Sequence, residues 1–243
     1  MSNPFERIGS GAKAYADVRP SYPQQLIDSL QLDAAKKVLD IGAGTGKLTA
    51  QLVRTGVQVF ALEPAADFRE TFLRALPEFS VERLLSTTAE ATSLPAHSFD
   101  LLTYGQCWHW LDSEAASAEA QRILRPQGEV AIFFNQFRVE IPWVLQLSRI
   151  MRSGDVHRFD KPPKLSAAFA EPKLTHVQWE QPLTVQELFE LGTTRSSWIK
   201  STPENRARMR ENLRWYLEEE LGYTNNDMVM LPYHTYLWRS QLK

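Results

Sequence analysis

A short apolar strand that runs directly into three closely spaced glycines is the feature that most constrains the fold of this chain. Residues 38–41 read VLDI, residues 42–46 read GAGTG, and apolar residues then recur at helical spacing. The glycines allow the backbone to approach a ligand, and the start of the helix supplies free N–H groups and a positive dipole end. This corner therefore predicts a site for a nucleotide or an anion.

The first half of the chain repeats this alternation of strand and helix. Further strands are predicted at 57–62, 81–86, 99–104 and 129–134, with helices at 24–30, 67–76 and 113–124. Alternating strands and helices require a parallel sheet covered on both faces, and right-handed crossovers make it doubly wound. We therefore expect an α/β fold.

The pattern changes after Phe137. It predicts a helix at 139–151, a covering loop at 155–172, a strand at 174–179, a helix at 185–191, a helix from Thr202 to Gly222 and a last strand at 228–238. No linker is long enough to separate two domains. We expect a single domain built from an N-terminal cap (1–34), a cofactor-binding core (35–137), a partly substrate-covering segment (138–205) and a C-terminal helix and strand (206–243).

Composition argues against several classes of protein. Lys plus Arg is 27 and Asp plus Glu is 29, which lacks the basic excess typical of a nucleic-acid binder. The single cysteine, Cys107, and the five histidines show no metal-ligand spacing, so no metal is expected. No signal sequence and no run of about 18–20 apolar residues is found, which favours a cytoplasmic protein without a membrane partner.

The residues around the glycines discriminate between nucleotides. A dinucleotide site has the pattern GxGxxG, but Lys47 stands where its third glycine belongs, and Leu48 breaks the P-loop pattern GxxxxGK[ST]. Asp40 ends the strand and would repel a pyrophosphate, whereas it suits an amino-bearing ligand. Glu63, 17 residues after Gly46, ends the second strand, where an acid accepts ribose hydroxyls. The pattern therefore favours an amino-bearing nucleoside over a nicotinamide cofactor.

These residues resemble the class I S-adenosylmethionine-dependent methyltransferases. VLDIGAGTGKLT is similar to their first motif, LEPAADF to the second, TAEATSLPAHSFDLLTYGQCWHWLD to the third and fourth, and RILRPQGEVAIFF to the fifth strand. The segments AYADVRPSYP, QCWHWLD and TVQELFELGTTRSSWIKSTPENR further resemble a subgroup that includes small-molecule enzymes of the trans-aconitate methyltransferase type.

The resemblance implies a Rossmann-like sheet of seven strands, mostly parallel with the last strand antiparallel, and S-adenosylmethionine as methyl donor. The implied donor-binding residues are Asp40, Gly42, Ala43, Gly44, Gly46, Glu63, Pro64, Phe68, Thr88, Ala89, Glu90 and Gln106. Asp40 would reach the amino group and Glu63 the ribose. Pro64 and Phe68 would flank the adenine, and Gln106 would approach the reacting centre. Thr88 departs from the pattern, since many relatives have Asp there.

The acceptor side has weaker signals. His109, between two tryptophans after the fourth strand, is a candidate general base or a substrate-shaping residue. Arginines bind carboxylates well, which makes Arg19 and Arg195 candidates for an anionic substrate. Tyr15 and Tyr233 are candidates to join the arginines, and Trp108 and Trp110 are candidates to line an apolar substrate pocket, with a core role as the alternative for the tryptophans.

These observations favour methyl transfer to a carboxylate or hydroxyl oxygen of a small molecule by a monomer or homodimer. The alternatives are a methyltransferase that acts on RNA or protein, and a non-catalytic protein that binds S-adenosylmethionine. The nucleic-acid enzymes carry an Asp/Asn-Pro-Pro-aromatic motif after the fourth strand, where this chain has GQCWHW.

Overall fold

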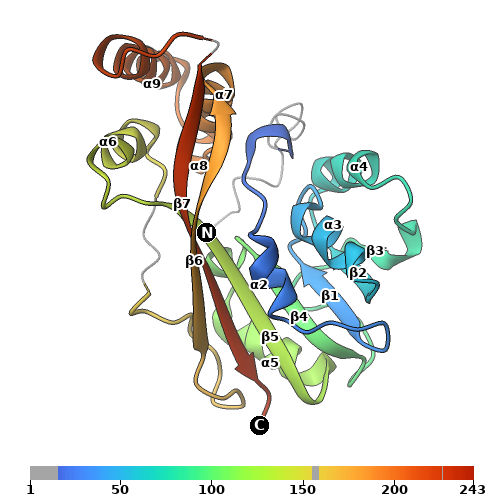
Figure 1. Cartoon of the computed structure of the whole chain (residues 1–243). Coiled ribbons are helices and arrows are strands. Elements are labelled where there is room, and N and C mark those ends of the chain that lie inside the picture. Colours follow the sequence, from blue (N-terminus) through green and yellow to red (C-terminus); the bar gives the residue numbers. More distant parts are fainter. Residues whose placement is uncertain (1–15, 155–158, 226) are drawn as a thin grey trace.

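The computed structural model describes residues 16–154, 159–225 and 227–243, and within them seven strands form one sheet (Figure 1). The order across the sheet is β3-β2-β1-β4-β5-β7-β6. The strands are β1 (Lys37–Ile41), β2 (Gln58–Leu62), β3 (Leu84–Leu85), β4 (Phe99–Gly105), β5 (Leu124–Phe137), β6 (Lys173–Thr184) and β7 (Met228–Gln241).

The predicted fold class is confirmed. Strands β1 to β5 pair in parallel, and β7 is inserted antiparallel between β5 and β6. Because the strand order reverses between β1 and β4, the crossovers diverge there to opposite sides. Ligands of doubly wound sheets bind at the carboxyl ends of the strands that flank such a point.

Helices cover both faces of the parallel part because successive strand residues point to opposite sides. Val38 of β1 packs with α2 (Gln24–Asp28) and α3 (Lys47–Arg54), whereas the next residue, Leu39, packs with α5 (Ser113–Ile123) on the other face. Helix α4 (Ala66–Ala75) packs through Phe72 on Ala61 of β2. The short apolar run recognised in the sequence is thus buried on both faces.

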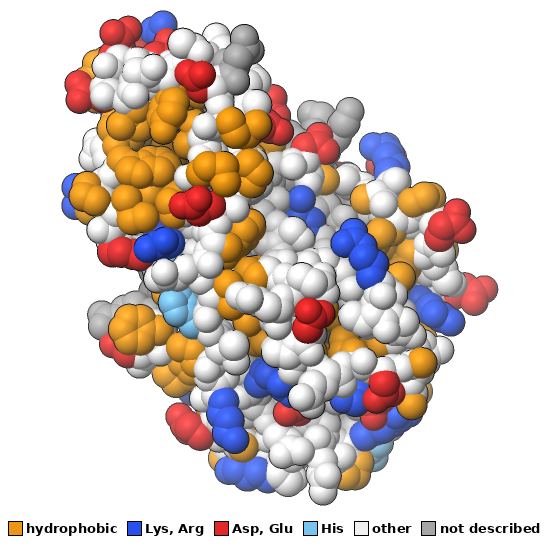
Figure 2. Space-filling model, viewed as in Figure 1, with side chains coloured by type: hydrophobic (Ala, Val, Ile, Leu, Met, Phe, Trp, Pro, Cys, Tyr) orange, Lys and Arg blue, Asp and Glu red, His pale blue; other side chains and the backbone are white. Residues whose placement is uncertain are grey.

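A second core lies where β6 and β7 extend beyond the other strands. Figure 1 shows both strands rising towards α6 (Pro142–Met151), α7 (Val185–Thr193) and α9 (Pro203–Trp215). Buried residues of the three helices pack with the far ends of these strands, among them Leu147, Leu188, Leu213 and Leu231. On this part of the surface Figure 2 shows apolar side chains gathered around the helices.

Several predicted boundaries were wrong. The strand predicted at 81–86 is a 3₁₀ turn, η1 (Val81–Arg83), followed by the two-residue β3, which ends the sheet and has β2 as its only partner among the described residues. Strand β5 begins at Leu124 opposite Phe99, and the predicted breaker RPQG forms an irregularity within it. The turn-forming residues of RPQG are tolerated within β5 because pairing with β4 sets the register on both sides of them.

The second half contains longer strands than predicted and one missed helix. Strand β6 runs on to Thr184, because all twelve of its residues pair with β7. The short helix α8 (Ser196–Ile199) was not predicted, since four residues carry no periodic signal. The predicted start of α9 is confirmed: Thr202 is its N-cap and Pro203 its first residue. No helix in the described part of the chain is long and apolar enough to cross a membrane.

Candidate active site

The glycine turn between β1 and α3 adopts a conformation that only glycine accommodates easily. Gly42, Gly44 and Gly46 have φ of +67°, +56° and +87°. A Cβ on Gly42 would lie 2.8 Å from the side chain of Cys107, and one on Gly46 would lie 2.9 Å from the ring of Phe72. The turn is therefore packed from behind, and Gly46 serves the contact between α3 and α4.

A cleft of about 520 Å³, partly open to solvent, lies in front of this turn at the carboxyl ends of β1 and β4. The cleft is lined by Arg19, Pro20, Tyr22, Asp40, Gly42, Ala43, Gly44, Thr45, Lys47, Leu48, Gly105 and Gln106. Six residues predicted from the sequence to bind donor or acceptor thus meet here: Arg19, Asp40, Gly42, Ala43, Gly44 and Gln106. The position agrees with the strand-order rule for doubly wound sheets.

Asp40 is a fully buried carboxyl group at the end of β1. Thr49 Oγ1 donates to its Oδ2 at 2.5 Å, and Thr103 Oγ1 donates to its Oδ1 at 2.9 Å. Burial raises the pKa of Asp40 to about 6, and the two threonine hydroxyls oppose that rise. Each oxygen keeps a lone pair, so Asp40 can still accept from a cationic ligand in the cleft.

Glu63 lies at the end of β2 and is 6% exposed. Its Oε2 accepts from the backbone N–H of Gly44 at 2.9 Å, and its Oε1 accepts from that of Ala65 at 2.8 Å. Burial raises the pKa of Glu63, and the two N–H donors oppose the rise. The carboxylate therefore ties the glycine turn to β2 and adds a second negative charge beside it.

Gln106 follows β4 with φ of +61°. Its side-chain amide donates to the carbonyl of Asn135 at 2.8 Å, so in this structure it bridges β4 and β5. Ala89 and Phe68 are buried, Glu90 is half-buried and Pro64 and Thr88 are exposed. These five residues lie outside the lining of the cleft. Glu90 accepts from the backbone N–H of Asp112 at 3.2 Å.

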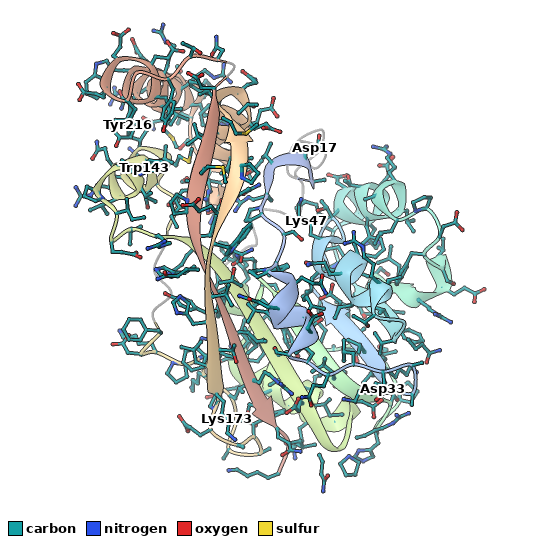
Figure 3. All side chains as sticks on the ribbon, viewed as in Figure 1. Asp17, Asp33, Lys47, Trp143, Lys173 and Tyr216 are labelled. Atoms are coloured by element: carbon teal, nitrogen blue, oxygen red, sulfur yellow. The ribbon has the colours of Figure 1, made fainter. Side chains whose placement is uncertain are left out.

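Lys47 and Tyr22 line the cleft but were not predicted to do so. In the sequence, Lys47 is a departure from the dinucleotide motif. Burial lowers its pKa, and the carboxylate of Asp17, on the N-terminal segment that Figure 3 shows beside it, acts in the opposite direction. The hydroxyl of Tyr22 lies 2.7 Å from where a Cβ on Gly105 would be. The position of Lys47, at the start of the helix that follows the glycine turn, was the sequence signal from which its place in the cleft could have been predicted.

The two arginines predicted for the acceptor are linked through Thr194, which binds Arg19 and precedes Arg195. Arg19 donates from Nε to Thr194 Oγ1 at 2.9 Å and from Nη2 to the Thr194 carbonyl at 2.7 Å. Arg195 follows Thr194 and occupies the N-cap position of α8. Its guanidinium lies 4.4 Å from the centre of the Phe137 ring. Tyr233 packs edge-on against the same ring at 5.2 Å. The structure thus brings Arg19, Arg195 and Tyr233 together, whereas Tyr15 lies outside the described residues.

The tryptophan–histidine segment forms a 3₁₀ turn, η2 (Trp108–Trp110). Trp108 is buried and packs edge-on against Tyr104 at 4.9 Å, which is a core contact. His109 is exposed and lies against Trp110, with ring centres 4.9 Å apart. Trp110 is half-buried, and Lys200 at the end of α8 lies 5.4 Å from its ring. Helix α8 therefore connects Arg195 at one end with Trp110 at the other.

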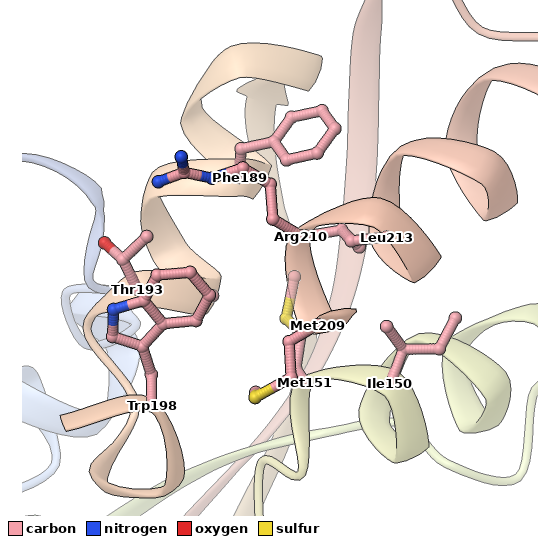
Figure 4. Close-up of a pocket in the computed structure, with 9 residues that line it drawn as sticks. Ile150, Met151, Phe189, Thr193, Trp198, Met209, Arg210 and Leu213 are labelled. Carbon is pink, nitrogen blue, oxygen red and sulfur yellow. The ribbon is translucent and has the colours of Figure 1, made fainter. Parts of the chain in front are cut away.

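A second, apolar pocket of about 270 Å³, partly open to solvent, lies among α6, α7, α8 and α9 (Figure 4). The labelled side chains around it are Ile150, Met151, Phe189, Thr193, Trp198, Met209, Arg210 and Leu213. None of the predicted site residues lines it. Across the described residues, no group of three or more His, Cys, Asp or Glu side chains is arranged to hold a metal ion.

Comparison with known proteins identifies the class that this fold and cleft define. Residues 39–132 match a methyltransferase domain family. An uncharacterized methyltransferase of Mycobacterium tuberculosis is 36% identical over 236 residues, which cover 97% of this chain and 95% of that protein. An uncharacterized methyltransferase of Schizosaccharomyces pombe is 26% identical over 225 residues, with 88% of each chain covered. The chain belongs to the methyltransferase family.

Solved structures agree on the fold. A putative type II methyltransferase from Anaeromyxobacter dehalogenans superposes with a TM-score of 0.58 at 20% identity, covering 92% of this chain and 96% of that one. Phosphoethanolamine N-methyltransferase 2 of Haemonchus contortus, solved with phosphomonomethylethanolamine and S-adenosylhomocysteine, gives a TM-score of 0.54 at 15% identity. It covers all of this chain and 60% of that one.

Proposed function

We propose that this methyltransferase uses S-adenosylmethionine and transfers the methyl group to a carboxylate or hydroxyl oxygen of a small molecule. The observation that best supports this choice of methyl donor is the pair of buried carboxyl groups, Asp40 and Glu63, beside the glycine turn. Their electrostatic influence disfavours a pyrophosphate and suits a ligand with an ammonium group, a sulfonium and a ribose. The Haemonchus contortus methyltransferase with its bound S-adenosylhomocysteine supports the same choice.

The residues present fit that donor. A Cβ on Gly44 would meet nothing closer than 4.0 Å, so this position of the turn is open and a ligand can lie against its backbone. Asp40 would accept from the ammonium group, and Glu63 would accept from the ribose hydroxyls with the lone pairs that Gly44 and Ala65 leave free. When bound, the donor supplies a methyl group already activated by its positively charged sulfur.

The remaining work of the protein is alignment. In a direct displacement, an acceptor oxygen forms the new bond to carbon while the carbon–sulfur bond breaks, and both electrons stay on sulfur. A carboxylate needs no general base because it is ionised at neutral pH, whereas a hydroxyl benefits from one. Residues of this chain therefore position the acceptor and exclude water. His109 is the candidate base for a hydroxyl acceptor.

Calorimetric titration with S-adenosylmethionine and S-adenosylhomocysteine tests the donor. The Glu63→Gln variant replaces one acceptor oxygen by a donor, and we expect its affinity to fall by about 10- to 100-fold. Glu70→Gln, on the exposed side of α4, is the matched control and should bind like the wild type. No binding by the wild type, or equal binding by both variants, would refute the proposal.

A turnover screen tests the acceptor. Small carboxylic acids and phenols are offered with the donor, and release of S-adenosylhomocysteine is measured. The competing substrate class is tested in parallel with tritiated donor and bulk tRNA, DNA or cell protein on filters. Label retained on a polymer, with none transferred to small acceptors, would replace the small-molecule proposal by a macromolecular one.

A further inference from the structure

Arg195 is a buried cation that no described side chain neutralises. It is 7% exposed, and its Nε and Nη2 are buried without a hydrogen-bond partner. The guanidinium lies over the ring of Phe137 instead. A cation is attracted less strongly by an aromatic ring than by a carboxylate. Buried charges in proteins are normally paired with an opposite charge. This arrangement therefore indicates an anionic ligand.

The two atoms without partners define the shape of that ligand. Nε and Nη2 lie on one edge of the planar guanidinium, with their N–H bonds nearly parallel, and this edge matches two oxygens of one carboxylate or phosphate. Arg19 uses the same edge on Thr194, whose hydroxyl and carbonyl oxygens occupy both donors. The contrast shows that the local structure satisfies one arginine internally and leaves the equivalent edge of the other unsatisfied.

Two connections place Arg195 beside the cleft. Arg19, which lines the cleft, is bonded to Thr194, the residue that precedes Arg195. Phe137, under the guanidinium, ends β5, and the carbonyl two residues before it accepts from Gln106, which also lines the cleft. Arg195 does not itself line the cleft, but these contacts place it at the carboxyl end of β5, one step from residues that do.

From these contacts the structure assigns to Arg195 the binding of an anionic group, a carboxylate or a phosphate monoester, carried by the methyl acceptor. This assignment rests on the proposed function and narrows its substrate to small organic anions. A neutral amide or ester of the same shape can offer its carbonyl oxygen to this edge, but it leaves the buried positive charge unneutralised, so it binds more weakly than the anion. If the bound carboxylate itself accepts the methyl group, its negative charge is lost, which favours release of the ester.

Anion-specific stabilisation tests the assignment on the intact chain saturated with S-adenosylhomocysteine. Thermal unfolding is measured in sodium chloride, sodium acetate and sodium phosphate at equal ionic strength. We expect acetate or phosphate to raise the Tm of the wild type by about 2–4 °C over chloride. Acetate alone indicates a carboxylate acceptor, and phosphate indicates a phosphate monoester. Arg195→Met should lose this gain, and Arg195→Lys should keep only part of it.

Arg210→Met is the matched control. Arg210 also lies over an aromatic ring, 5.6 Å from the centre of Trp198, but it is exposed on α9. Its variant should show the wild-type gain, because general salt effects act on every variant alike. In chloride, Arg195→Met should be at least as stable as the wild type, since it removes an unpaired buried charge.

Two outcomes would overturn the assignment: equal acetate and phosphate effects in all variants, or a wild type that gains nothing. Titration with S-adenosylhomocysteine separates this failure from failure of the proposed function. Arg195→Met should bind it with unchanged affinity. If the wild type does not bind it, the donor proposal fails, and the anion measurements are then repeated without it and still decide the role of Arg195.

Discussion

Burial raises the pKa of the Asp40 carboxyl group, and its hydrogen bonds from Thr49 and Thr103 lower it. Its pKa is about 6, against 3.8 for an ordinary aspartate. Between these values the folded protein holds a proton that the unfolded chain has released. This contribution to the free energy of unfolding is therefore present at low pH and falls as pH rises from about 4 to about 6, by up to about 3 kcal/mol. Urea unfolding across that range should show the fall in the wild type.

Asp40→Asn is the informative variant for this pH dependence. The amide can still pair with both Thr49 and Thr103, because hydroxyls donate and accept. Relative to this variant, the wild type should lose stability as pH rises from about 4 to about 6. Parallel curves for the two proteins would show that Asp40 titrates normally.

Donor binding should release a proton from the same residue. An ammonium group next to Asp40 favours the carboxylate, so its pKa falls on binding. At a pH near 6 we expect calorimetric titration in two buffers of different ionisation enthalpy to report release of a fraction of a proton. The affinity should rise with pH in this range. Asp40→Asn should exchange no proton at this site, and identical proton release by both proteins would contradict the proposed contact.

Gly42 makes a steric prediction. Gly42→Ala places a methyl group against Cys107 and forces a residue with a Cβ into the left-handed region, so we expect a loss of at least about 2 kcal/mol in urea unfolding. Cys107→Gly removes both contacting atoms. The double variant should therefore lose less than the sum of the two single losses. Strict additivity would mean that the overlap costs nothing.

At the scale of elements, the start of α7 matters because its other end leads to Thr194 and Arg195. Thr184 and Glu187 form a reciprocal cap: the Thr184 hydroxyl accepts from the Glu187 N–H at 3.2 Å, and the Glu187 carboxylate accepts from the Thr184 N–H at 2.7 Å. This double pairing anchors α7 to the end of β6.

Thr184→Ala should lower the free energy of unfolding by about 1–2 kcal/mol, because it leaves the backbone N–H of Glu187 without its partner and removes one half of the reciprocal cap. Thr202→Ala is the control. Thr202 caps α9 through one 3.4 Å bond at an exposed position, so its loss should be about 0.5–1 kcal/mol. Urea unfolding measures both. A larger loss for Thr202→Ala would show that the cap of α7 is not the stronger one.

Predictions of helices and strands succeeded where they depended on a local sequence pattern. They failed where contacts with distant segments set the extent of the element. The run from Val38 to Ile41, the glycine turn and the cap of α9 were all confirmed, because each depends on residues close in sequence. Strand β6 was underestimated because its length is set by β7. Helix α8 was missed because its four residues are ordered by contacts with Arg206 and Met151.

Across the whole molecule, the N-terminal segment binds the end of α7 through Arg19 and Thr194, and it also binds the sheet. Asn135 of β5 donates to the Ser21 carbonyl at 2.9 Å and accepts from Thr235 of β7 at 2.5 Å. Gln181 of β6 donates to the Val18 carbonyl at 3.1 Å. These bonds connect residues that are distant in sequence and lie near the cleft. We therefore expect donor binding in the cleft to stabilise the whole molecule against unfolding.

We expect saturating S-adenosylhomocysteine to raise the Tm of the protein. At a concentration 100 times its dissociation constant, linkage adds about 2.7 kcal/mol, or about 5–10 °C for a chain of this size. NADH at the same concentration is the control and should leave the Tm unchanged, because Asp40 and Lys47 do not suit a dinucleotide. A shift with NADH alone would favour an oxidoreductase.

The doubly wound sheet and the glycine corner could be predicted from the sequence alone, because hydrophobic period, turn glycines and the acids at the ends of β1 and β2 are patterns of residues close together along the chain. The surroundings of the residues predicted for the acceptor became visible in the folded structure alone. It separated Trp108, a core residue, from exposed His109, and it distinguished satisfied Arg19 from unsatisfied Arg195. The reason is physical: whether a charged side chain is paired depends on neighbours that folding brings from distant segments, which no local pattern encodes.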